Sequence, residues 1–389
     1  MGRHLRQLSH LTRREALGIL GAGTGMAIAA GCGSGGPPAG ESGGEMESAP
    51  AAAPDITFPA GAVIRTVLGD VDPATLAHGH TLFHEHLNIG QAYAVPPLDE
   101  RRGFDELLPD DETETFLQLV SDELRMSAAD GLACIVDAAI HRRSEEQLEY
   151  LRQMSTRSGV AVVAAGAYWR APFPENIAAM NVDELTEHLI TDARGQNWGA
   201  FGEVGTSMEM HETERTFLHA VSRAHHATNL PIFTHTEHEG CRPCGLEQLD
   251  VFEEENVDFS RVCIGHLSDI TSEQDPGWTS HLEVGRRGAW LGFDTVGREL
   301  GIEAHPDVPE ADKVRMVLNV LEAGYEDQVL LAADFAASNQ LKSNWGNGFS
   351  TAIVQFVPKL RFAGVDEATL HKIAVDTPRR FMAFVPREA

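Results

Sequence analysis

From about Asp55 onward, short apolar runs alternate with longer segments whose apolar residues recur at helical spacing. Eight of the apolar runs are expected to be strands: Thr81–Glu85, Ala133–Asp137, Val160–Ala167, Ala200–Val204, Pro231–His235, Val262–His266, Trp290–Asp294 and Val329–Ala333. Four intervening segments are expected to be amphipathic helices: Glu112–Ala129, Asp183–Ala193, Glu212–Thr228 and Asp312–Ala323. Continuous apolar strands separated by helices indicate a parallel sheet that is covered on its faces.

Eight such units between residues 55 and 389 predict an α/β protein of the (β/α)₈ TIM-barrel class. The main rival is a doubly wound open sheet. No G-x-G-x-x-G motif follows an early strand, so the nucleotide-binding form of that fold lacks support. The early segment Ile64–Asp70 is expected to form a small strand that caps the barrel.

Residues of the types that bind metals stand where the apolar runs end. There are six of them, at five strand ends: His84, His86, Glu203, His235, His266 and Asp334. The first two are two positions apart in one strand, so both imidazoles can face the same ion. Any one of these residues alone is more often a cap or a surface group. Because the carboxyl ends of parallel barrel strands meet at one face, five such ends together predict a site there.

Imidazoles and carboxylates suit Zn²⁺, with Mn²⁺, Co²⁺ or Fe²⁺ as the other candidates, better than Ca²⁺ or Mg²⁺. Four histidines and two carboxylates exceed the needs of one four-coordinate ion. They suffice for two divalent ions that share a bridging carboxylate, the arrangement used in metal-assisted hydrolysis. The pattern therefore predicts a binuclear metal site at the C-terminal face of the barrel.

Five longer motifs carry a resemblance to a known family: Ile64–Gly69, His84–Leu87, Pro231–Thr236, Cys263–His266 and Thr377–Phe381. Together they resemble the phosphotriesterase family of the amidohydrolase superfamily, over nearly all of the chain after its first 54 residues. The resemblance implies the barrel, the binuclear site and a homodimer.

The resemblance also implies a role for each ligand. The two histidines of the first strand would share the more buried ion with Asp334, while His235 and His266 would hold the more exposed ion. Glu203 would bridge the two ions at a position where many members carry a carbamylated lysine. No lysine precedes Lys313, so that group is not available here. A glutamate at this position resembles the branch of phosphotriesterase-related proteins, and it points away from the substrates of the best-known organophosphate-degrading members.

The activity that this resemblance implies is metal-dependent hydrolysis. A metal-bridged hydroxide would attack a lactone or carboxylic ester, with promiscuous activity toward phosphotriesters, and Asp334 would take its proton. Two alternatives stay open. One is an amidase that acts on small N-acyl compounds, and the other, from a different class, is a lipid-anchored solute-binding protein with a degenerate site.

Three residues are candidates for binding the substrate: Tyr168, Trp169 and His141. Tyr168 stands where lactone-hydrolysing relatives carry a tyrosine, so its hydroxyl could orient a substrate oxygen. It could equally pack the mouth of the barrel with Trp169. The family's usual Gly-Arg-Asp sequence is absent around His141, which leaves that end of the pocket open. Asp294 is expected either to support the site or to cap its strand.

The cysteines suggest one local cross-link. Cys241 and Cys244 form a C-x-x-C pair. A disulfide is the first interpretation, because the N-terminal residues described below predict export, and free thiols are the second. Cys134 and Cys263 lie within apolar strands and are expected to be buried and inert. His225-His226 are expected at the surface of their helix.

The first 54 residues are expected to be an export signal followed by a flexible linker. Residues 1–32 resemble a twin-arginine export signal, with Arg13-Arg14 before an apolar run that is too short for a confident membrane span. Small residues before Cys32 resemble a lipoprotein cleavage site, so Cys32 is the predicted lipidation site; the alternative is removal of Cys32 by an ordinary signal peptidase. Residues 33–54 read as a flexible Gly/Ser/Pro/Ala linker. The prediction is a periplasmic or cell-surface protein.

Charge excludes some partners. The chain carries 58 acidic and 30 basic residues, a formal charge of −28. Binding to nucleic acid requires Lys and Arg to neutralise phosphates, so nucleic acid is not an expected partner. Attraction to anionic lipid headgroups is disfavoured for the same reason, which leaves the N-terminal lipid as the expected membrane contact. The expected partner is a small-molecule ester or lactone.

Overall fold

The structure is a computed structural model that describes residues 56–87, 110–298, 308–336 and 340–387. The predicted export signal, Cys32 and the predicted linker lie outside these residues. Within the described part of the chain, no helix combines the length and the apolar character that a membrane crossing requires.

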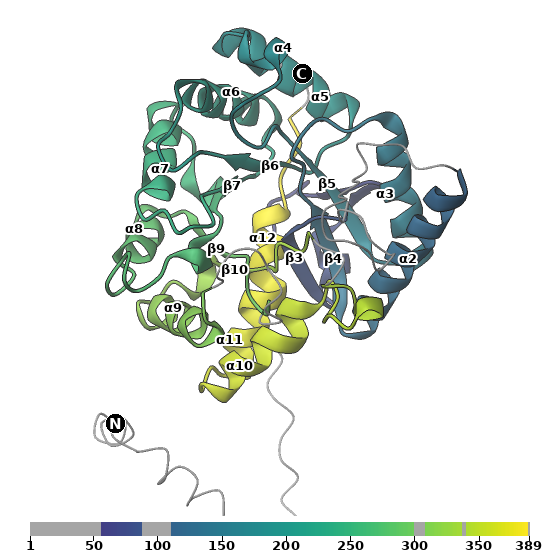
Figure 1. The fold of residues 1–389 in the computed structure, drawn as a ribbon, viewed down its shortest axis with the longest axis vertical. Coiled ribbons are helices and arrows are strands. Elements are labelled where there is room, and N and C mark those ends of the chain that lie inside the picture. The colour runs from purple at the N-terminus through teal and green to yellow at the C-terminus, as the bar shows by residue number, and fades with distance from the viewer. Residues whose placement is uncertain (1–55, 88–109, 299–307, 337–339, 388–389) are drawn as a thin grey trace, which may run out of the picture. The chain divides into compact units, whose positions relative to one another are not determined.

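Eight parallel strands form the central sheet, and helices surround it (Figure 1). The strands are β3 (His80–Glu85), β4 (Leu132–Asp137), β5 (Ala161–Gly166), β6 (Ala200–Gly205), β7 (Ile232–His235), β8 (Val262–Ile264), β9 (Trp290–Phe293) and β10 (Val329–Leu331). Their order in the sheet follows the chain from β3 to β10. Beyond β10, His86 donates its backbone N–H to Phe335 O (2.8 Å), and Asp334 donates to His84 O (3.2 Å). These bonds join the last strand to the first, so the predicted (β/α)₈ barrel is confirmed.

The longer helices that cover the barrel are α2 (Asp110–Ala129), α3 (Glu145–Ser158), α5 (Val182–Gly195), α6 (Glu212–Thr228), α7 (Cys244–Glu254), α8 (Thr279–Arg287) and α9 (Glu310–Glu322). Four of them, α2, α5, α6 and α9, follow the four predicted segments within two residues at each end. Several begin with a capping box: in α5, the Asn181 side chain accepts from the N–H of Glu184, and the Glu184 side chain accepts from the N–H of Asn181. Shorter helices follow: α4 (Glu175–Ala178), α10 (Val357–Phe362), α11 (Glu367–His371) and α12 (Thr377–Met382).

The early segment forms a hairpin rather than one strand. Strand β1 (Ile64–Thr66) pairs antiparallel with β2 (Gly69–Val71). Gly69 has a φ of +133°, a region open mainly to glycine, which accounts for the turn at this position. Val63 forms a bridge with Phe384, which ties the beginning of the barrel domain to its end.

Successive residues of the strands pack on opposite faces, which produces two apolar layers. Leu82, Ile135 and Val162 belong to the layer between strands and helices, whereas Val136 and Val163 belong to the layer inside the barrel. The thiols of Cys134 and Cys263 are also buried in the inner layer, as predicted, and burial raises the pKa of Cys134 to about 12.

The expectation that His225 lies at the surface is wrong. Its side chain on α6 is 4% exposed, and its Nδ1–H donates to Leu230 O at 2.6 Å. Helical periodicity turns this position toward the sheet, whereas its neighbour His226 remains half-buried. Burial lowers the pKa of His225 to about 4, because a charged imidazole would lose its hydration there.

This burial predicts an acid-sensitive contribution to stability. The pKa of His225 is lower in the folded chain than the ordinary value of 6.5, so the unfolded chain binds the extra proton first. The contribution is complete above pH 6.5 and falls as the pH drops toward 4, by about 2 kcal/mol between pH 7 and pH 5. We therefore expect the stability difference between wild type and His225→Gln to shrink by that amount in urea unfolding at the two pH values. An equal difference at both pH values would contradict this assignment.

Candidate metal centre

The six strand-end residues converge at the carboxyl ends of the barrel strands. His86 Nε2 lies 3.0 Å from Asp334 Oδ1 and 3.3 Å from Glu203 Oε1, while His84 Nε2 lies 3.5 Å from Glu203 Oε2. Glu203 Oε2 lies 2.9 Å from His235 Nδ1. His266 Nε2 is 2.7 Å from the same His235 nitrogen. One cluster therefore joins side chains that lie up to 250 positions apart in the sequence.

Three groups of side chains among the described residues could each hold a metal ion, because one ligand atom from each member lies within 4.8 Å of the others. The groups are His84–His86–Asp334, His84–Glu203–His266 and His235–His238–His266. The first is the set predicted for the more buried ion. The second contains Glu203 between the two halves of the cluster, and the third contains both residues predicted for the more exposed ion. The third also contains His238, which the sequence analysis missed.

Two β-bulges aim ligand candidates into the cluster. Between β3 and β4, Leu82 pairs with Ile135 and Glu85 with Asp137, so Phe83 and His84 together oppose one residue. Between β6 and β7, Phe201 pairs with Ile232 and Val204 with Thr234, so Gly202 and Glu203 oppose Phe233. A Cβ at Gly202 would lie 2.1 Å from the Phe233 ring, so this position requires glycine. Bulges of this kind redirect side chains and occur often beside active sites.

Asp294 orients two of the histidines. Its Oδ2 lies 2.8 Å from His84 Nδ1, and its Oδ1 lies 3.0 Å from His266 Nδ1 and 2.7 Å from the His266 backbone nitrogen. An ionised carboxylate accepts only, so both Nδ1 atoms carry hydrogen, and both Nε2 atoms are left to face a metal. Of the two expectations for Asp294, the structure therefore supports the one in which it supports the site.

Glu85 holds the backbone on both sides of Asp334. The fully buried Glu85 carboxylate accepts the backbone N–H groups of Ala333 (2.8 Å) and Phe335 (2.7 Å), which flank Asp334. Asp334 has a φ of +46° and His266 a φ of +56°, in the left-handed region that such residues rarely adopt. Surrounding bonds must hold these two conformations, and strain of this kind is typical of functional sites.

The cluster attracts positive charge. Burial alone would raise the pKa values of Glu203 and Asp334, but the neighbouring histidines hold both well below their usual range. Conversely, burial opposes protonation of His84, yet Glu203 and Asp294 raise its pKa to about 10. Ionised carboxylates buried this deeply require a cation next to them. Divalent ions would meet this requirement and leave the imidazoles neutral.

An orphaned nitrogen in the cluster fits the same interpretation. The buried Nε2 atom of His84, on the side of the ring that faces Glu203, has no hydrogen-bond partner in the described structure. A buried ring nitrogen without a partner is costly in a stable fold, so it points to a missing ligand. The nitrogen and carboxylate donors present here are those that Zn²⁺ and its first-row relatives prefer.

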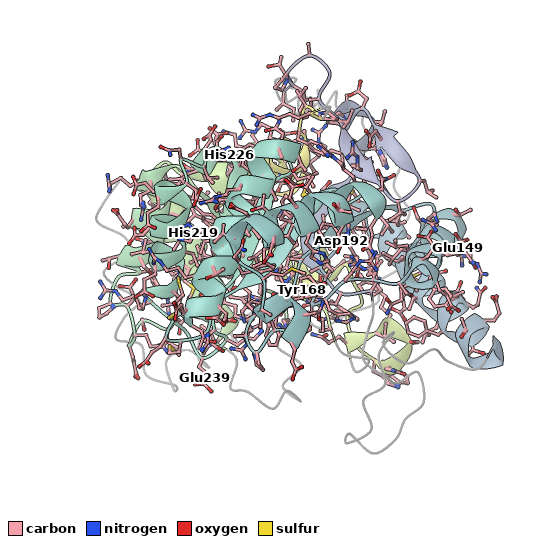
Figure 2. The ribbon with its side chains drawn as sticks, turned by 90° about the horizontal axis from the view of Figure 1, so that it is seen from above. Glu149, Tyr168, Asp192, His219, His226 and Glu239 are labelled. Carbon is pink, nitrogen blue, oxygen red and sulfur yellow. A yellow bond between two sulfur atoms is a disulfide. The ribbon has the colours of Figure 1, made fainter. Side chains whose placement is uncertain are left out.

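The three predicted substrate residues lie in different surroundings. The Trp169 ring packs edge-on against His235, with centroids 5.0 Å apart, and His141 shares with His86 the lining of a cavity of about 60 Å³. Tyr168 is not brought to the cluster. Its hydroxyl lies 3.2 Å from Nε2 of His188 on α5, and the same nitrogen lies 3.3 Å from Asp192 Oδ2; Figure 2 labels Tyr168 and Asp192. The Tyr168 ring packs edge-on against Phe217 on α6. The expected orientation of a substrate oxygen by Tyr168 is corrected accordingly, because its side chain faces the helix layer.

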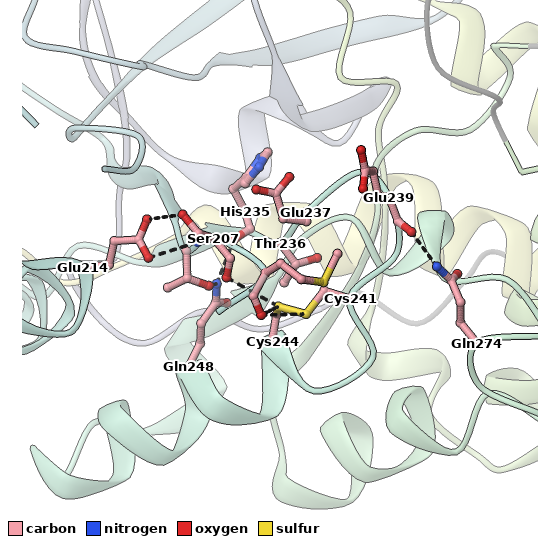
Figure 3. The surroundings of a disulfide bond; sticks show 12 residues. Ser207, Glu214, His235, Thr236, Glu237, Glu239, Cys241, Cys244, Gln248 and Gln274 are labelled. Atoms are coloured by element: carbon pink, nitrogen blue, oxygen red, sulfur yellow. Dashed lines mark hydrogen bonds between the residues drawn. A yellow bond between two sulfur atoms is a disulfide. The ribbon is translucent and has the colours of Figure 1, made fainter. Parts of the chain in front are cut away.

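The loop after β7 is closed by the disulfide between Cys241 and Cys244, the first of the two interpretations for this pair (Figure 3). Both cysteines are buried, beside the carbonyl groups of Ser207 and Met208. The same loop carries His238, and Arg298 also reaches the site, with Nη1 3.4 Å from Asp334 Oδ2. Neither residue ends a strand, so the rule that located the other ligands gave no signal for them.

A parallel barrel with histidines and carboxylates gathered at the carboxyl ends of its strands is the architecture of the barrel metallohydrolases. The model of the phosphotriesterase family matches residues 62–382. The chain belongs to this family, and it is a hydrolase.

Proteins of known function or structure resemble nearly the whole barrel domain. N-acetyltaurine hydrolase from Danio rerio is 28% identical over 357 residues, which cover 82% of this chain and 98% of that protein. The phosphotriesterase homology protein from Escherichia coli, solved with phosphate in its active site, is 26% identical, with a TM-score of 0.65 over 80% of this chain and all of that one. A lactonase from Listeria monocytogenes is 25% identical, with a TM-score of 0.67 over 83% of this chain and 99% of that one.

The bonds that Asp294 makes predict its effect on metal affinity. In Asp294→Asn, the amide NH₂ group cannot accept a hydrogen bond, so one of the two histidines loses the partner that fixes its tautomer. We expect the affinity for Zn²⁺ to fall by about 10–100-fold, with the fold retained. Competition with a chromophoric chelator measures the affinity, and circular dichroism checks the fold. An unchanged affinity in the folded variant would refute this role.

Proposed function

We propose that this chain is a binuclear metal-dependent hydrolase that cleaves the acyl bond of small carboxylic acid derivatives. The observation that carries the proposal is the convergence of four histidines, Glu203 and Asp334 into overlapping groups that could hold metal ions. His84, His86 and Asp334 would hold one ion and His235 and His266 the other, with Glu203 between them. Two ions held there would supply an activated water as nucleophile and a Lewis acid for the substrate carbonyl.

Asp334 is the proposed general base. Its Oδ1 faces His86, whereas its Oδ2 faces Arg298 at 3.4 Å and His238 Nε2 at 3.7 Å. The lowered pKa keeps this carboxylate ionised, so Oδ2 would accept the proton of the attacking water and hold it for the leaving group. The Trp169 ring beside His235 would exclude bulk water from one side of the reacting bond.

An N-acyl amide with a small anionic amine part is the leading substrate. The curated relatives with 26–28% identity are N-acetyltaurine hydrolases, which favours an amide. Arg298, whose side chain is 12% exposed, would offer a cation to an anionic group beside the reacting bond. The Tyr168 hydroxyl, the feature that favoured a lactone, faces His188 instead.

A lactone is the second candidate, supported by the similarity to the lactonase from Listeria monocytogenes. A solute-binding protein with a degenerate site is the remaining alternative, and the complete ligand set argues against it. The N-terminal motifs support export and lipid anchoring at Cys32 as a further part of the proposal.

A substrate panel tests the proposed reaction. The full chain would be reconstituted with Zn²⁺, Mn²⁺ or Co²⁺ and assayed with N-acetyltaurine, other N-acyl amino acids, lactones, aryl esters and a phosphotriester. We expect about two ions per chain by elemental analysis and the highest kcat/KM for an N-acyl compound. A lactone preference would select the second candidate. Absence of metal binding together with absence of turnover would leave the binding protein.

The role of Asp334 predicts that Asp334→Asn separates metal binding from catalysis. The asparagine oxygen can still face an ion, but the amide cannot take a proton, so we expect kcat to fall by about 10²–10⁴-fold while the metal content stays unchanged. The matched control is Asp250→Asn, a neutralised carboxylate that pairs with Arg287 at the surface and should leave kcat unchanged. If Asp334→Asn turned over as fast as the parent, Asp334 could not be the base.

A further inference from the structure

His238 is held toward the metal centre although it follows no strand end. It lies on the loop between β7 and α7, and its side chain is 38% exposed. Its ring centroid lies 4.2 Å from that of His266 and 5.1 Å from that of His235. The ligand atoms of these three histidines lie within 4.8 Å of one another, close enough to surround one ion.

A buried carboxylate fixes which nitrogen of His238 faces the centre. Asp269 is 6% exposed, and its Oδ2 lies 2.8 Å from His238 Nδ1, while its Oδ1 accepts a hydrogen bond from the Thr295 hydroxyl at 2.5 Å. Nδ1 therefore carries the hydrogen, and Nε2 presents its lone pair. Nε2 lies 3.7 Å from Asp334 Oδ2, on the inner side of the loop.

This arrangement repeats the one that Asp294 makes with His84 and His266. In each case a buried carboxylate accepts the Nδ1–H, and Nε2 faces the cluster. Such a carboxylate is the usual companion of a histidine that ligates a metal, because it fixes the ring and increases its basicity. The other nitrogen of His238 faces Asp334, which belongs to the proposed metal centre.

The backbone of the loop is also held in place. Gly240 has a φ of +79°, and a Cβ there would lie 2.7 Å from Asp269 O, so the loop packs directly against the segment that carries Asp269. Gln274 donates to Glu239 O at 2.5 Å, and the disulfide closes the far end of the loop (Figure 3). His238 is thus fastened through its side chain and through its backbone.

We infer that His238 is a seventh protein ligand, which binds through Nε2 to the more exposed ion beside His235 and His266. The inference rests on the proposed binuclear function and adds a ligand from outside the strand ends. Three imidazoles and the carboxylate of Glu203 would then complete a four-coordinate site for this ion. A water or substrate atom would enter as a fifth ligand.

The test measures metal binding rather than turnover. Zn²⁺ and Co²⁺ would be titrated into the full chain and into His238→Asn against a chromophoric chelator, which gives one Kd for each ion. We expect the Kd of the more weakly bound ion, the exposed one beside His238, to rise by about 10–100-fold. The Kd of the more tightly bound ion should change little. The visible spectrum of the Co²⁺ protein should shift in the same variant, because it depends on the ligands of the ion.

His188→Asn is the matched control, since His188 bonds to Tyr168 outside the cluster and should alter neither Kd. Asp269→Asn should weaken the same ion as His238→Asn, by about 10-fold, and it decides the matter should His238→Asn fail to fold. Unchanged Kd values and an unchanged Co²⁺ spectrum in the folded variant would overturn the inference while leaving the proposed function intact. A wild-type chain that binds no second ion would overturn both.

Discussion

The carboxylate of Asp294 holds two histidines of the cluster in the orientation that metal binding requires. It accepts hydrogen bonds from the Nδ1 atoms of His84 on β3 and His266 beyond β8, and from one backbone amide. Because a carboxylate has no hydrogen to donate, these bonds fix both tautomers and direct both Nε2 atoms inward. Without this constraint the histidines could rotate or exchange protons, and the cluster would have no defined binding geometry.

The rest of the fold holds the cluster against local preferences. Bulges turn His84 and Glu203 inward. The Glu85 carboxylate accepts hydrogen bonds from the backbone N–H groups on both sides of Asp334, whose own backbone lies in the left-handed region. Such features lower the stability of a barrel, and the surrounding layers of apolar side chains must offset them. The concentration of buried carboxylates adds a second cost, which a bound cation would relieve.

The residues at the mouth of the barrel come from the loops that follow the strands. Trp169 and His141 lie near the cluster, whereas Tyr168 lies in the helix layer beside His188. The loop after β7 brings His238 to the cluster and is closed by a disulfide. Loops placed on a rigid scaffold are where barrel enzymes differ from one another.

The sequence by itself determined the barrel and the six strand-end residues. Apolar runs reveal strands, and in a parallel barrel the end of every strand reaches the same face, so a local pattern was enough. The tertiary structure alone showed that Asp294 and Glu85 hold the cluster, that His238 lies beside it and that Tyr168 faces His188. Each of these depends on a contact with a residue distant in the chain or on a loop conformation. Hydrophobic periodicity carries no information about such contacts, because it records only which face of an element is buried.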